Sequence, residues 1–139
     1  MYMTPEMQAF ATGFPVTLAH AAISLIFLII GAVAYAFLTP YQEIREIRDG
    51  NAAAAVSFGG VLIGLAIPLA VSLAASTSLQ ELSIWGASIT AVQLLLFRLT
   101  DFFLKGLPQR VEEGEVAAAF LLVAAKLACA LILAAAVAG

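Results

Sequence analysis

No Asp, Glu, Lys or Arg occurs between Glu6 and Glu43, or between Asp49 and Glu81. Each of these stretches is long enough for a helix that crosses a membrane, because a hydrocarbon core of about 30 Å needs about 20 helical residues. The chain is 63% hydrophobic and 11% charged, whereas soluble domains average about 45–50% and about 25%. We therefore predict an all-α membrane protein in which residues 1–139 form a single four-span domain. The predicted spans are Phe14–Leu38, Ala52–Ala75, Leu82–Leu104 and Val116–Ala138.

The basic residues in the loops predict the orientation of the chain. Arg45 and Arg48 follow the first span, and Lys105 and Arg110 follow the third. Loops rich in Lys and Arg stay in the cytoplasm, so we expect both charged loops there and both termini outside.

The segment before the first span has Glu6 but no basic residue, so the first span is expected to remain as an anchor rather than act as a signal peptide. The net charge of −3 argues against nucleic acid as a partner.

One sequence pattern occurs twice: charged residues, a glycine, one polar residue, alanines and a long apolar run. It reads RDGNAAAAVSFGG at residues 48–60 and EEGEVAAAFLLVA at residues 112–124. We interpret it as a tandem duplication, with one repeat at about 14–75 and the other at about 82–138, although chance similarity of apolar segments is the alternative. Because each repeat contains two spans, both copies have the same topology and can be related by a pseudo-two-fold axis along the membrane normal.

The junction inside each repeat combines a helix end with a helix start. Gly50 and Gly114 stand where a helix favours a left-handed C′ residue. Asn51 and Glu115 follow them and can supply an N-cap oxygen or an early negative charge to the next helix. We therefore expect a short cytoplasmic connector helix before each glycine.

The first connector has a helix-start signal of its own. Thr39 to Gln42 fits a capping box, with Pro40 at the first helical position. Ile44 and Ile47 are three residues apart among charged neighbours, which is typical of a short helix lying at the membrane interface. This helix is either a docking surface for a cytosolic partner or a solvated turn that separates the first two spans.

The second span has one face of small residues. Gly60, Gly64, Pro68, Ser72 and Ser76 recur at every fourth position. The two glycines have the spacing that lets membrane helices touch closely. Pro68 lacks an N–H, so the Gly64 carbonyl needs another donor inside the bilayer. The face is either a hinge or a wet break along a pathway, or a tight packing surface within the chain or between copies.

Four polar residues are expected to meet between the third and fourth spans. Lys126 lies near the midplane, where a lysine is unfavourable by roughly 2.5–3.5 kcal/mol and normally faces a partner or a wet cavity. Gln93 lies at about the same depth, and Lys126 leans towards Asp101 because helical side chains point towards the helix N-terminus. Arg98 is three residues from Asp101 and can pair with it. This group is either a site that binds or passes a small ion or proton, or an internal buttress of mutually neutralised charges.

The remaining reactive side chains indicate no catalytic chemistry. One Cys and one His cannot build a disulfide framework or a zinc site within one chain. We expect His20 to be a hydrogen-bonded packing residue, Cys129 a small core hydrophobe and Trp85 an anchor in the aromatic belt. We find no phosphate loop and no nucleophile elbow, and therefore predict no cofactor, no metal and no enzymatic activity.

A set of short motifs runs from the first connector through the third span. Its members are Thr39-Pro40, Glu43, Asn51, Ala53-Ala54, Gly60, Gly64, Pro68-Leu69, Ile84–Gly86 and Val92–Phe97. The set resembles the bacterial inner-membrane family called domain of unknown function 350. The resemblance covers about residues 38–136 and implies a four-span inner-membrane protein with duplicated halves, but no established activity. The chain departs from the family pattern at Glu115, usually a second asparagine, at Arg98, one turn before the usual arginine, and at Lys126, where the last span usually has no lysine.

Two functions fit these features. The leading hypothesis is a homo-oligomeric conduit for a small ion or proton, because one four-helix protomer has little room for an aqueous path. The face of Gly60 and Gly64 is then the expected meeting place of the copies. The alternative is a non-catalytic assembly or scaffold subunit that packs against other membrane proteins through its Gly and Ala faces. The lipid bilayer is the expected environment in both cases.

Overall fold

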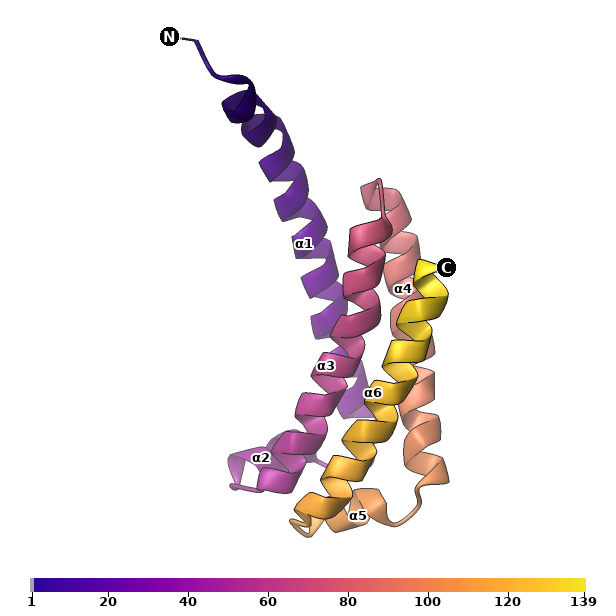
Figure 1. Cartoon of the computed structure of the whole chain (residues 1–139). Coiled ribbons are helices and arrows are strands. Elements are labelled where there is room, and N and C mark those ends of the chain that lie inside the picture. The colour runs from indigo at the N-terminus through magenta and orange to yellow at the C-terminus, as the bar shows by residue number, and fades with distance from the viewer. Residues whose placement is uncertain (1) are drawn as a thin grey trace.

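The computed structural model describes residues 2–139, and within them every regular element is a helix (Figure 1). The elements are α1 (Pro5–Leu38), α2 (Glu43–Arg48), α3 (Ala52–Ala75), α4 (Leu79–Phe103), α5 (Leu107–Glu112) and α6 (Val116–Ala138). Four of them, α1, α3, α4 and α6, are long and apolar enough to cross a membrane, which confirms the prediction of four spans. Helix α4 begins before the predicted Leu82, at Leu79.

The first helix is much longer than the predicted span. It has 34 residues and begins at Pro5 rather than at Phe14. The hydroxyl of Thr4 accepts a hydrogen bond from the N–H of Met7 at 3.2 Å, and Pro5 occupies the first helical position. This local N-cap starts the helix early. Residues 2–18 are all exposed, and in Figure 1 this end of α1 stands apart from the other helices.

Helices α3 and α6 lie side by side at the centre of the bundle, and α4 packs against both. Gly60 of α3 faces Val123 of α6, and Gly64 faces Phe97 of α4. A Cβ atom on Gly64 would lie only 2.6 Å from the Phe97 ring. The expectation that copies of the protein meet through the Gly60 and Gly64 face is therefore wrong, because side chains of the same chain already fill the space beside both glycines.

The turn between α1 and α2 differs from the predicted capping box. Thr39 closes α1 as its C-cap, and α2 begins only at Glu43. Gln42 is the N-cap of α2 and makes no capping hydrogen bond through its side chain. A proline disfavours helical conformation at the residue before it. Pro40 therefore ends α1 instead of starting α2.

The two short helices end in the same way. Gly50 after α2 and Gly114 after α5 both have φ of +91°, a left-handed conformation that glycine adopts without strain. At each end the N–H of the glycine and the N–H of the next residue bond back to carbonyls of the last turn, which is a Schellman motif. The bounds of α5 and the start of α6 follow those of α2 and α3 by 64 residues.

Asn51 links the two junctions to each other. Its Oδ1 caps α3 by accepting an N–H of the first turn at 3.1 Å. Its Nδ2 donates to the carbonyls of Val111 and Glu112, at 3.0 and 3.1 Å, at the end of α5. Of the two contributions expected of Glu115, an N-cap oxygen or an early negative charge, the first is not made, because its carboxylate pairs with Arg110 and α6 has no side-chain cap. A single amide therefore satisfies orphan backbone groups of two helices.

Candidate functional site

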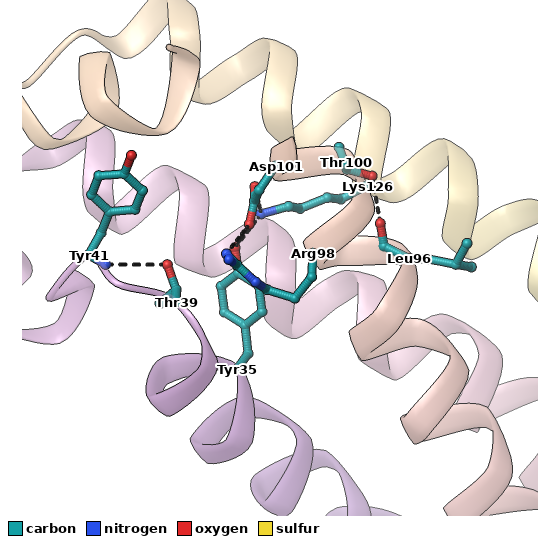
Figure 2. Close-up of polar contacts among 8 residues, drawn as sticks. All are labelled: Tyr35, Thr39, Tyr41, Leu96, Arg98, Thr100, Asp101 and Lys126. Atoms are coloured by element: carbon teal, nitrogen blue, oxygen red, sulfur yellow. Dashed lines mark hydrogen bonds and ion pairs between the residues drawn. The ribbon is translucent and has the colours of Figure 1, made fainter. Parts of the chain in front are cut away.

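A lysine, an aspartate and a tyrosine from three helices meet inside the bundle (Figure 2). Lys126 Nζ of α6 lies 2.9 Å from Asp101 Oδ1 of α4 and donates a hydrogen bond to the hydroxyl of Tyr35 of α1 at 2.6 Å. The Tyr35 hydroxyl donates in turn to Asp101 Oδ2 at 2.6 Å. Lys126 and Tyr35 are each 1% exposed, and Asp101 is 8% exposed. We call these three residues the Lys126 triad.

The triad explains how an apolar helix accommodates a deeply placed lysine. Besides the carboxylate and the phenol, Lys126 meets two aromatic faces, with Nζ 4.7 Å from the centre of the Tyr35 ring and 5.8 Å from that of Phe97. Such faces attract cations electrostatically. Each buried charge is thus paired and hydrogen-bonded, which is the condition for burying charge at tolerable cost. The triad connects α1, α4 and α6.

Arg98 lies at the edge of the triad. Its Nη1 is 3.4 Å from Asp101 Oδ2, and its side chain is 36% exposed while that of Asp101 is 7% exposed. The structure therefore brings together three of the four residues expected to form a polar group, Arg98, Asp101 and Lys126.

Gln93 does not join the other three residues, because its side chain forms a hydrogen bond with α3 instead. Its Nε2 donates to the carbonyl oxygen of Gly64 at 2.9 Å. Pro68, four residues further on, has no N–H with which to satisfy that carbonyl. Inside a bilayer the unsatisfied carbonyl costs several kcal/mol, so the amide of Gln93 turns towards α3 and not towards Lys126.

Two residues of the site were not among those expected from the sequence, Tyr35 and Glu43. Tyr35 is separated from Lys126 by 91 positions, and a tyrosine near the end of a span carries no signal of a buried partner. Glu43 is the first charged residue after the first span. That position and its place among the family motifs are the available signals, and both equally suit a solvated turn.

Glu43 is a buried carboxyl group close to the triad. It is 9% exposed, and its Oε2 has no hydrogen-bond partner among the described residues. Burial is the main reason that the pKa of Glu43 is raised to about 7. The positive charge of Lys126 lowers this pKa, and the negative charge of Asp101 raises it. A cavity of about 10 Å³ is lined by Glu43, Asp101 and Ser57 among others, and has room for about one water molecule. The site therefore combines a group that titrates near neutral pH with a buried ion pair.

The other reactive side chains lie apart from this site. His20 Nδ1 is 2.8 Å from the carbonyl oxygen of Val16 in the same helix. Cys129 is a free, half-buried thiol on α6, and Trp85 is 49% exposed in the second turn of α4. In the part of the chain that the structure describes, no three His, Cys, Asp or Glu residues are grouped so as to hold a metal ion.

Four apolar helices around a buried charge cluster define a polytopic α-helical membrane protein. A profile of the family described as Domain of Unknown Function (DUF350) matches residues 9–137. The chain belongs to this family, which confirms the resemblance inferred from its motifs.

Similar proteins come from the membranes of two bacteria. The chain is 29% identical over 128 residues to UPF0719 inner membrane protein YjfL of Escherichia coli (strain K12), covering 92% of each chain. It is 24% identical over 105 residues to UPF0719 transmembrane protein YshE of Bacillus subtilis (strain 168), covering 74% of this chain and 78% of that protein. No solved structure matches the chain significantly. The relatives and the four apolar helices together support a multi-pass inner-membrane protein.

Proposed function

We propose that this protein is a non-enzymatic proton conduit of the inner membrane, in which Glu43 and the Lys126 triad exchange protons. The observation that carries the proposal is the unpartnered Oε2 of Glu43, a buried carboxyl with a pKa of about 7, beside the buried pair of Lys126 and Asp101. Ionisable groups inside a membrane commonly mark proton relays. A group that titrates near the working pH is the most effective at taking up and releasing protons.

The size of the cavity favours a proton over a larger ion. About 10 Å³ beside Glu43 and Asp101 accommodates about one water molecule, which is too little for a hydrated metal ion or anion. A proton moves along hydrogen-bonded groups without displacing them. The hydroxyl of Tyr35, which accepts from Lys126 and donates to Asp101, is suited to such transfer.

Buried polar atoms continue beyond the triad, away from α2 and α5. Gln93 Oε1 and Ser72 Oγ are buried and have no hydrogen-bond partner among the described residues. Buried polar atoms of this kind are sites where ordered water binds. They support a path that continues between α3 and α4 towards the opposite membrane surface.

The proposal places the α2 and α5 end of the bundle in the cytoplasm, with both termini outside. Arg45 and Arg48 lie on α2, and Lys105 and Arg110 lie on or beside α5, so the positive-inside rule favours this orientation.

The 64-residue offset between corresponding helix bounds supports two tandem repeats of the same topology. Copies of the protein assemble in this proposal, because one protomer has little room for a continuous aqueous path.

Glu43→Gln is expected to lower proton flux about 100-fold, because an amide cannot take up and release the proton. Flux is measured in liposomes with a pH-sensitive dye inside and a potassium diffusion potential across the membrane. A second readout is the free energy of unfolding. In the wild type it should fall as the pH rises from 4.5, the ordinary pKa of glutamate, to about 7, since the folded state there holds a proton that the unfolded state has released. In the variant this dependence should disappear.

The matched control is Glu113→Gln, which makes the same change at an exposed acid after α5. It should leave both the flux and the pH dependence of unfolding unchanged. A wild-type flux no greater than that of empty liposomes would refute conduction. A pH dependence that persists in Glu43→Gln would show that another group titrates.

The free end of α1 favours the alternative, a non-catalytic scaffold subunit. Phe10 and Phe14 on this end are 64% and 44% exposed. The 34 residues of α1 span about 51 Å, well beyond a hydrocarbon core of about 30 Å. Native mass spectrometry of the protein released from lipid and the liposome flux assay together separate the two functions. A conduit is expected to be a homo-oligomer that conducts protons. A scaffold is expected to be a monomer without proton flux.

A further inference from the structure

A basic depression lies on the surface where α4 ends and where the chain passes from α1 to α2. Its volume is about 220 Å³, and its lining includes Tyr41, Arg98, Asp101, Phe102 and Lys105. It adjoins the small cavity beside α2, and Tyr41, Asp101 and Pro108 line both. The depression therefore reaches from the surface to the edge of the Lys126 triad.

Both cations of the depression have hydrogen-bond donors to spare. Arg98 meets Asp101 through Nη1 alone, at 3.4 Å, which is long for a charge-assisted hydrogen bond. Lys105 forms no ion pair within residues 2–139, and its Nζ lies 4.5 Å from the centre of the Phe102 ring. Asp101 is the one acid in the lining and is already bound by the other two members of the triad. The depression thus offers net positive charge to an anion.

The depression lies at the end of α4, one of the four helices long and apolar enough to cross a membrane. Arg98 belongs to the last two turns of α4, and Lys105 comes two residues after Phe103, the last residue of the helix. Phe102 and Phe103 are 59% and 77% exposed, as expected of side chains that face acyl chains. Basic side chains near the end of a span reach towards the lipid headgroups. An anion held by Arg98 and Lys105 would therefore lie level with lipid phosphates.

We propose that this depression binds the phosphate of an anionic phospholipid headgroup, with Arg98 and Lys105 as its cationic contacts and Phe102 against an acyl chain. Guanidinium and ammonium groups are the side chains that recognise phosphate, and basic pockets beside membrane helices bind such headgroups. The bound lipid would compete with Asp101 for Arg98 and so change the charge beside the triad. The inference does not depend on proton conduction.

The test measures which lipids remain on the intact protein after its release from vesicles that contain equal amounts of phosphatidylcholine and phosphatidylglycerol. Native mass spectrometry counts the bound lipids. The wild type should retain phosphatidylglycerol in preference. Lys105→Gln should weaken its binding about fivefold and Arg98→Gln/Lys105→Gln about 25-fold, since each basic residue near the surface contributes about 1 kcal/mol.

The control Arg45→Gln/Arg48→Gln removes the same charge from α2, which does not line the depression, and should weaken the binding much less than Arg98→Gln/Lys105→Gln does. Lys105→Gln leaves the contact between Arg98 and Asp101 in place, so a loss in this variant is not a loss of fold. Equal retention of the two lipids by the wild type would overturn the proposal, as would equal losses in the two double variants. Displacement of the lipid by millimolar inorganic phosphate would assign the site to free phosphate and overturn the lipid assignment.

Discussion

Lys126→Met is expected to lower the free energy of unfolding by about 3 kcal/mol, because it leaves the buried Asp101 with only its longer contact to Arg98 as an ion pair. In the wild type Lys126 Nζ lies 2.9 Å from that carboxylate and 2.6 Å from the hydroxyl of Tyr35. Methionine fills a similar volume but donates no hydrogen bond. Unfolding in mixed detergent micelles measures the loss, and proton flux in liposomes should fall in parallel.

Two further variants test the cause of this loss. Lys126→Met/Asp101→Asn removes both charges and should cost less than the sum of the two single changes, since residues in one network are coupled. Lys105→Met removes an exposed lysine that contacts only the Phe102 ring and should change the free energy of unfolding by no more than about 1 kcal/mol. Additive losses from the single variants would contradict the triad as a connection between α4 and α6.

Gly64→Leu is expected to destabilise the protomer by about 3 kcal/mol through overpacking. The first added atom, Cβ, would already lie 2.6 Å from Phe97 Cζ. Phe97 is fully buried, so its ring has little room to move away. The larger side chain would also separate α3 from α4 and stretch the hydrogen bond from Gln93 to the Gly64 carbonyl. The same unfolding measurement in detergent micelles applies.

Gly59→Leu is the matched control on the same helix. A Cβ atom on Gly59 meets nothing within 4 Å, so the change should alter the free energy of unfolding by less than about 1 kcal/mol, mostly through helix propensity. A Gly64→Leu protein that keeps the wild-type free energy of unfolding but loses its oligomeric state would contradict the packing described here. The small-residue face would then belong to contacts between copies.

The proposed repeats carry different chemistry on the same framework. At the 64-residue offset, Asp101 corresponds to Phe37, and Lys126 corresponds to Leu62. These two counterparts are 85% and 37% exposed, whereas the two charged residues are buried. A duplication would thus have supplied the framework, and the ion pair of Lys126 and Asp101 belongs to one copy of it. This asymmetry directs mutagenesis of the ion pair to α4 and α6.

The features that could be predicted from the sequence are those with local causes. The four spans follow from apolar length, and a membrane leaves the backbone no alternative to helix over such lengths. The conformations of Gly50 and Gly114, φ of +91° in both, follow from the rule that a helix end favours glycine in a left-handed C′ position. Pro68 implies an unsatisfied carbonyl at Gly64 by its covalent structure alone. None of these features depends on which helix lies beside which.

Which residues become partners was decided only by the tertiary structure. The Gly64 carbonyl needs a donor, and only packing against α4 assigns Gln93 to it. Lys126 needs a counter-charge, and the arrangement of three helices adds Tyr35 to Asp101 as its partners. Glu43 is buried because α2 folds back beside the cavity that Asp101 also lines. These contacts join residues far apart in the chain, so their energies depend on the positions of whole helices, which periodicity and capping rules do not determine.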